Sequence, residues 1–121
     1  MGKGQKLYSK AKQLVAGGNM LLSKRPEMFL PEHWPAYFSK TSGCEVWDLD
    51  GNKYIDTLMT PGTNSLGYSH PEVDEAVKEI VGNGNMSSLN APEEVELTER
   101  LVELHPWADM ARFARSGGEA N

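Results

Sequence analysis

The chain has one cysteine among its 121 residues, Cys44, and it lacks any long run of apolar residues. A single cysteine excludes an internal disulfide, and nothing in the cysteine content indicates an oxidising compartment. No apolar segment approaches the length of a membrane span, and the N-terminus lacks the continuous apolar core of a signal peptide. We therefore expect a cytoplasmic protein. Cys44 is expected to be a half-buried packing thiol, because no His lies near it in the sequence and its neighbours are expected to form strands.

Basic residues and histidines are also scarce. Lys and Arg number 12 against 17 Asp and Glu, which gives a net charge of −5 and argues against a general nucleic-acid binder. The three histidines, His33, His70 and His105, lie far apart and have no ligand-type neighbours at helical spacing, so no metal site is predicted. Residues 48–52 do not fit a calcium loop of the EF-hand type, because Gly is fourth rather than sixth and Met59 stands at the twelfth position.

The first half of the chain changes pattern twice. Residues 5–16 are typical of an amphipathic helix, which Gly17 and Gly18 end. Residues 20–35 carry three of the seven prolines and predict an irregular arm. Three short strands then form a small antiparallel meander, with a turn at Asp50-Gly51-Asn52, and they are expected at residues 37–40, 45–49 and 53–56.

The second half predicts two helices and a strand. Pro71 opens the first helix, which carries a single apolar stripe and ends at residues 82–84. The second opens at Pro92 and runs to residues 105–106, with acidic residues in its first turn. Residues 110–115 are expected to form a short strand. Because this strand has no parallel partners in the sequence, we interpret the chain as a piece of a larger α/β domain.

The glycine-rich turn Ser116-Gly117-Gly118 follows that strand. Glycines let the backbone approach an anion, successive N–H groups form a concave nest, and the Ser hydroxyl adds a donor. A helix normally follows such a turn, yet the chain ends three residues later and the helix is expected to be missing. Taken alone, a turn of this composition is also compatible with an ordinary loop.

Four ordered motifs between Trp34 and Asn121 carry a family resemblance. They are Gly43–Asp56 (GCEVWDLDGNKYID), Leu66–Val73 (LGYSHPEV), Ala91–Leu97 (APEEVEL) and Arg112–Ala120 (RFARSGGEA). Together they resemble the N-terminal region of class III aminotransferases, in particular the glutamate-semialdehyde aminomutase branch. Residues 1–33 match only loosely.

The resemblance implies a partial α/β fold of the fold-type-I pyridoxal-phosphate (PLP) transferases. It predicts an N-terminal helix and irregular arm at residues 1–33, the antiparallel meander at 34–68, and the helices with the first strand of the cofactor-binding large domain at 69–121. The family works as a homodimer that transfers an amino group from an amino donor to a carbonyl acceptor. Its phosphate-binding Ser-Gly-Thr loop corresponds to Ser116, Gly117 and Gly118, where Gly118 replaces the frequent Thr and removes one hydroxyl donor.

Two further positions correspond to substrate contacts in the aminomutases. Pro61 occupies the place of an aromatic residue that lies over the substrate, a departure that suggests a different amino-group acceptor. Arg25 falls near the arginine that binds the substrate carboxylate, although packing of the arm or simple solvation explains this residue equally well.

The family's Schiff-base lysine and the carboxylate that faces the pyridine nitrogen correspond to no position before Asn121. The resemblance therefore assigns no catalytic residue to this chain, and we expect the chain alone to be inactive. Two other hypotheses stay open: a non-catalytic module that binds a phosphate ligand or pairs with a related subunit, and a truncated product without a function of its own.

Overall fold

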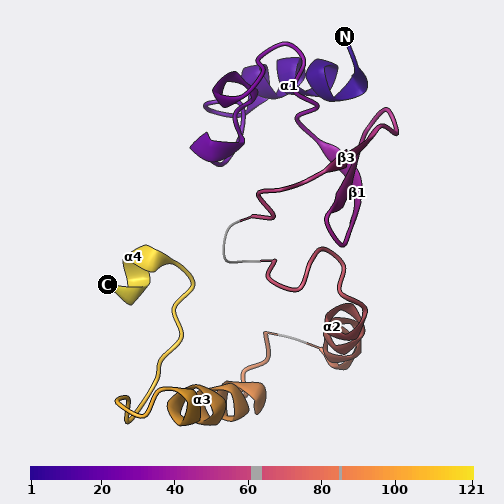
Figure 1. Cartoon of the computed structure of the whole chain (residues 1–121). Helices are drawn as coiled ribbons and strands as arrows, with labels where there is room; N and C mark the ends of the chain where they lie inside the picture. Colours follow the sequence, from indigo (N-terminus) through magenta and orange to yellow (C-terminus); the bar gives the residue numbers. More distant parts are fainter. Residues whose placement is uncertain (61–63, 85) are drawn as a thin grey trace. The chain divides into compact units, whose positions relative to one another are not determined.

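The structure is a computed structural model that describes residues 1–60, 64–84 and 86–121. The chain divides into two compact units, Met1–Lys78 and Glu79–Asn121. Its elements are α1 (Lys3–Leu14), the short 3-10 helices η1 (Leu22–Lys24) and η2 (Pro26–Met28), β1 (Phe38–Ser42), β2 (Glu45–Asp48), β3 (Lys53–Ile55), α2 (Pro71–Asn83), α3 (Glu93–Leu104) and α4 (Gly117–Ala120) (Figure 1).

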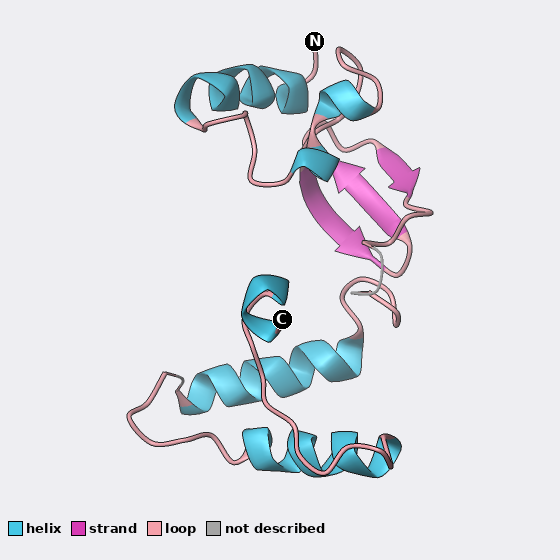
Figure 2. Ribbon diagram, turned by 90° about the vertical axis from the view of Figure 1, so that its left-hand side faces the viewer, coloured by secondary structure: helices cyan, strands magenta, loops and turns pink. Residues whose placement is uncertain are grey.

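The three strands form the predicted antiparallel meander in the order β1-β2-β3 (Figure 2). The turn between β2 and β3 is built around Asp48, whose side chain is buried at 6% exposure. Its carboxylate accepts hydrogen bonds from the backbone N–H groups of Asp50 and Asn52, the Asn52 amide and the Tyr54 hydroxyl. Gly51 has a φ of +86°, a backbone conformation that a side chain would strain.

Helix α1 contacts the arm and the meander through its first turn. The backbone N–H of Lys3 donates to the Asp50 carboxylate at 2.7 Å, and the Gln5 amide donates to the carbonyls of His33 and Trp34. At Gly4 the helix lies so close to the Pro35 carbonyl that a Cβ atom would overlap with it. These contacts bring the start of the helix to Lys3, two residues before the predicted start.

Helices α2 and α3 begin where the prolines predict. Pro71 is the first residue of α2, and Pro92 precedes the first residue of α3. The apolar stripe of α2 is exposed along its length, at Val73, Val77, Ile80 and Val81. None of the helices in the described parts of the chain is both long and apolar enough to cross a membrane.

Three details differ from the sequence-based expectations. Residues 110–115 form no hydrogen-bonded strand, because a strand requires a neighbour and none of the described residues pairs with this segment. A single helical turn, α4, follows Ser116 where the helix was expected to be missing. Cys44 is exposed rather than half-buried, since it lies at the turn between β1 and β2 with no element over it.

Candidate functional site

The predicted phosphate loop forms a bend from extended backbone into a helical turn. Ser116 is extended, with φ −149° and ψ 159°, and its carbonyl accepts from the N–H groups of Glu119 and Ala120 at 3.1 and 3.2 Å. Among the described residues, neither the N–H of Gly117 nor that of Gly118 has a hydrogen-bond partner, and the Ser116 hydroxyl caps no helix. Nothing lies within 4 Å of the position that a Cβ of either glycine would take. The loop therefore presents unpaired donors to open space.

Glu119, the acidic residue within the helical turn after this loop, is engaged elsewhere. Glu119 accepts from the backbone N–H of Arg115 at 2.8 Å and pairs with the Arg115 guanidinium at 3.1 Å. Both interactions draw the negative charge toward the segment before the loop. Repulsion between Glu119 and an anion at Ser116 is therefore reduced.

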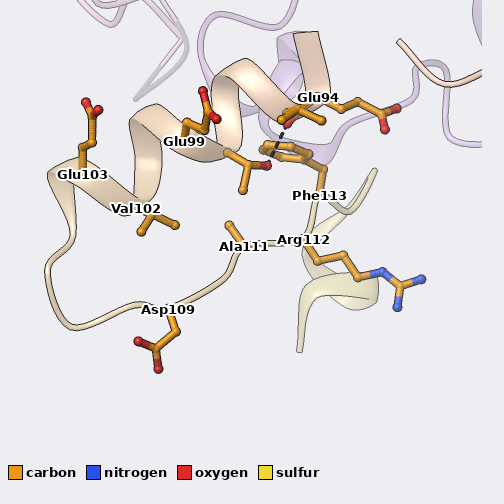
Figure 3. Close-up of a pocket in the computed structure, with 10 residues that line it drawn as sticks. Glu94, Glu99, Val102, Glu103, Asp109, Ala111, Arg112 and Phe113 are labelled. Carbon is orange, nitrogen blue, oxygen red and sulfur yellow. Dashed lines mark hydrogen bonds between the residues drawn. The ribbon is translucent and has the colours of Figure 1, made fainter. Parts of the chain in front are cut away.

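A hollow in the second unit does not include the loop among its lining residues. A groove of about 950 Å³ runs between α3 and the extended segment that follows it. Figure 3 shows the Phe113 ring beside the helix and Arg112 directed away from it. The groove is lined by Glu94, Val95, Thr98, Glu99, Val102, Glu103, Asp109, Ala111, Arg112 and Phe113. An open groove that mixes apolar side chains with four carboxylates has no convergent set of donors for a phosphate.

Arg25 lies in a smaller hollow in the first unit. Its guanidinium packs against Gly17, where a Cβ atom would lie 2.5 Å from Nη2. The Nε atom of Arg25 is buried and has no hydrogen-bond partner among the described residues. The hollow has a volume of about 420 Å³ and is lined by Tyr8, Lys12, Gly17, Gly18, Arg25 and Glu27.

A tyrosine–carboxylate pair forms one wall of this hollow. The Tyr8 hydroxyl donates to Glu27 at 2.8 Å, and Lys12 lies 3.9 Å from the same carboxylate. The hydrogen bond from Tyr8 holds the pKa of Glu27 below its usual value, and the same bond raises the pKa of the Tyr8 phenol. Glu27 is therefore ionised at neutral pH while it faces Tyr8.

Pro61, the other predicted substrate contact, lies outside the described residues. Thr60 and Asn64, the described residues on either side of 61–63, belong to a polar cluster. The Tyr68 hydroxyl donates to Asp56 at 2.6 Å and contacts the Thr60 hydroxyl at 3.3 Å, while Asn64 donates to Thr60. The hydrogen bond from Tyr68 also lowers the pKa of Asp56.

Sequence reasoning named Arg25 as a candidate but did not name the residues around it. Tyr8 and Lys12 lie four residues apart on α1, a spacing that places them on one helix face, whereas Glu27 lies in η2 and nothing in the sequence indicates that it meets them. Gly17 was interpreted as a helix stop alone, although its φ of +76° and its contact with Arg25 give it a second role.

Comparisons with known proteins match most of the chain. The family model "Aminotransferase class-III" matches residues 30–121. The 3-aminobutyryl-CoA aminotransferase of Cloacimonas acidaminovorans is 36% identical over 99% of this chain and 29% of its own length. The glutamate-1-semialdehyde 2,1-aminomutase of Fusobacterium nucleatum is 37% identical over 94% of this chain and 26% of its own length. The chain thus spans just over a quarter of the length of these curated relatives.

Solved structures show the same likeness in three dimensions. The FumI protein of Sphingopyxis sp. MTA144, solved in a PLP internal aldimine form, superposes with a TM-score of 0.85 and 31% identity, over 98% of this chain and 28% of that one. A transaminase with PLP bound gives a TM-score of 0.82 and 32% identity, over 98% of this chain and 27% of that one. These likenesses confirm the predicted partial fold-type-I α/β architecture. On the matched family model and these relatives, the chain belongs to the class-III aminotransferase family.

Proposed function

We propose that this chain contributes the arm, the meander and the phosphate loop of a PLP-dependent class-III aminotransferase or aminomutase. Such an enzyme moves an amino group between a small amino compound and a carbonyl acceptor. The observation that carries the proposal is the family's motif Arg112–Ala120 standing at a bend whose amides are unpaired.

The residues present fit the phosphate of the cofactor. The Ser116 hydroxyl and the backbone N–H groups of Gly117 and Gly118 would donate to phosphate oxygens, and the absence of side chains at both glycines lets the backbone approach. When bound, PLP supplies the electron sink for amino-group chemistry. The role of Ser116–Gly118 is to hold the phosphate and so to orient the ring.

Substrate binding is assigned to Arg25 and Pro61. The Arg25 guanidinium, whose buried Nε has no partner within the described chain, would bind a substrate carboxylate in a bidentate manner. Pro61 would contact the substrate where the aminomutases have an aromatic ring. Its smaller, non-aromatic side chain favours an acceptor other than that of the strict aminomutases.

The remaining features of the proposal come from the family. We infer a cytoplasmic homodimer, organised as the arm at residues 1–33, the meander at 34–68 and the start of the large domain at 69–121. No lysine of this chain stands at a Schiff-base motif, so the anchoring amine is proposed to lie outside residues 1–121.

The test is to express the full-length protein that carries this chain and to add PLP with candidate amino donors. We expect bound cofactor, visible by its absorbance, and amino transfer to a carbonyl acceptor. Borohydride reduction followed by peptide mapping should place the trapped cofactor on a lysine outside residues 1–121. A full-length protein that binds no PLP would overturn the proposal.

A further inference from the structure

We propose that the Tyr8–Glu27 pair is a positioning device that keeps Arg25 free to bind a ligand carboxylate. The inference deepens the proposed function and rests on it, because it assumes that Arg25 binds the substrate. Tyr8 and Glu27 touch no substrate in this account. They act through Arg25 alone.

Arg25 is unusual because its guanidinium has no direct partner among the described residues. The lowered pKa of Glu27 comes first from the hydrogen bond from Tyr8, and the charge of Arg25 contributes to it only at longer range. Arg25 forms no ion pair and no side-chain hydrogen bond among the described residues, although its Nε is buried and its guanidinium is pressed against Gly17. A buried donor on a cationic group is costly when unpaired. Such a group beside an open hollow of about 420 Å³ is therefore suited to receive an anion.

Within the chain, the Glu27 carboxylate is the group that would compete with a ligand anion for the Arg25 guanidinium. Glu27 is two residues from Arg25, and both line the same hollow. Its carboxylate is instead turned to the Tyr8 hydroxyl at 2.8 Å and toward Lys12 at 3.9 Å. The phenol thus satisfies a carboxylate that would otherwise pair with the guanidinium.

The pair therefore sets the affinity of Arg25 for a ligand. Without the Tyr8 hydroxyl, Glu27 loses its nearest donor and turns to Arg25, where it competes with the substrate carboxylate. Removing the charge of Glu27 at the same time abolishes the competition. The double variant should therefore recover the wild-type affinity for the ligand carboxylate. If the hydrogen bond had only a structural role, the double variant would stay as weak as Tyr8→Phe, because both variants have lost the same bond.

The experiment uses the full-length protein and four forms: wild type, Tyr8→Phe, Tyr8→Phe combined with Glu27→Gln, and the control Tyr54→Phe. The control removes a tyrosine–carboxylate bond of the same kind, from Tyr54 to Asp48 at 3.1 Å, which lies outside the hollow. For each form, KM and kcat are measured with an amino donor that bears a carboxylate and with an amine that lacks one. PLP absorbance of each form is recorded first.

We expect Tyr8→Phe to raise KM for the carboxylate donor about 3- to 5-fold, the effect of one partly exposed ion pair. The kcat, the KM for the plain amine and the cofactor absorbance should stay unchanged. The double variant should return to the wild-type KM, and Tyr54→Phe should not change it. Equal KM values for wild type and Tyr8→Phe, or a double variant as weak as the single one, would overturn the inference.

A binding measurement separates this result from the proposed function. In the full-length protein, the Arg25 Nε–H signal should shift on titration with glutarate, and the shift should need more ligand in Tyr8→Phe than in wild type. A parallel titration with inorganic phosphate tests whether the hollow prefers a carboxylate, and a stronger response to phosphate would contradict that assignment. Absence of PLP from the full-length protein would overturn the proposed function, whereas an unmoved Nε–H signal would overturn the inference.

Discussion

The contact between α1 and the arm at Gly4 allows a sharp test of the structure. Substituting Gly4 with Ala would place a Cβ atom onto the Pro35 carbonyl and within 3.0 Å of its carbon. Both partners are backbone, so relief requires displacement of the helix or of the arm. Overpacking of this kind costs about 1–3 kcal/mol.

The same substitution has an opposite and smaller effect through helix propensity. Alanine in a helix interior is favoured over glycine by about 0.5–1 kcal/mol. Gly82, in α2, provides the matched control because nothing lies within 4 Å of its Cβ position. We expect Gly4→Ala to lower the free energy of unfolding by about 1–2 kcal/mol and Gly82→Ala to raise it by up to about 0.5 kcal/mol, because Gly82 lies one residue before the end of α2.

The assay is a urea titration followed by the amide NMR signals of each helix, since the two units need not unfold together. For Gly4→Ala the signals of α1 report the change, and for Gly82→Ala those of α2. If Gly4→Ala proves as stabilising as Gly82→Ala, the close approach of α1 to Pro35 is wrong and so is the derived position of the helix start.

The remaining predictions concern the turn, the hollow and the isolated chain. Hydrogen bonds, led by that from the Asn52 amide, hold the pKa of Asp48 below its usual value. The meander is therefore most stable above the unfolded-state pKa of Asp48, and it loses that stabilisation as the pH falls through the folded-state pKa. Circular dichroism should show this loss of stability in acid for the wild type, whereas Asp48→Asn should start from a lower stability and depend less on pH. Gly17→Ala should weaken glutarate binding in the NMR titration, because its Cβ displaces the Arg25 guanidinium and its φ of +76° disfavours a side chain; unchanged binding would contradict the contact. The 121-residue chain mixed with PLP should give no borohydride-trapped adduct at a specific lysine, and a stoichiometric adduct found by mass spectrometry would refute our placement of the anchoring amine. The same chain should melt broadly, because Tyr8 and Pro26 are the only apolar side chains that are buried among the described residues, and a sharp two-state transition from a monomer would count against this.

Local signals in the sequence predicted the helices and the meander well. Pro71 and Pro92 marked the starts of α2 and α3 because a proline without an N–H is best tolerated in the first helical turn or just before it. The alternation of residues and the glycine at 51 predicted the meander. Each of these signals acts over a few residues.

Features that depend on distant contacts were not predictable in the same way. The start of α1 is set by Asp50, which lies 47 residues away from Lys3. The segment 110–115 has the composition of a strand but no hydrogen-bonded neighbour among the described residues, and local propensity cannot supply one. The hollow around Arg25 likewise brings α1 residues Tyr8 and Lys12 together with Arg25 and Glu27 of the arm, and no local pattern predicts that contact.

The central claim is that Ser116, Gly117 and Gly118 hold the phosphate of PLP. The most direct test measures the affinity of the full-length wild type and of its Ser116→Ala variant for two ligands. One ligand is PLP, and the other is pyridoxal, which lacks the phosphate. Because a hydrogen bond to a charged group contributes about 1.5–3 kcal/mol, Ser116→Ala should weaken PLP binding by roughly tenfold or more and leave pyridoxal binding unchanged. Equal losses for both ligands, or no loss for PLP, would contradict the claim.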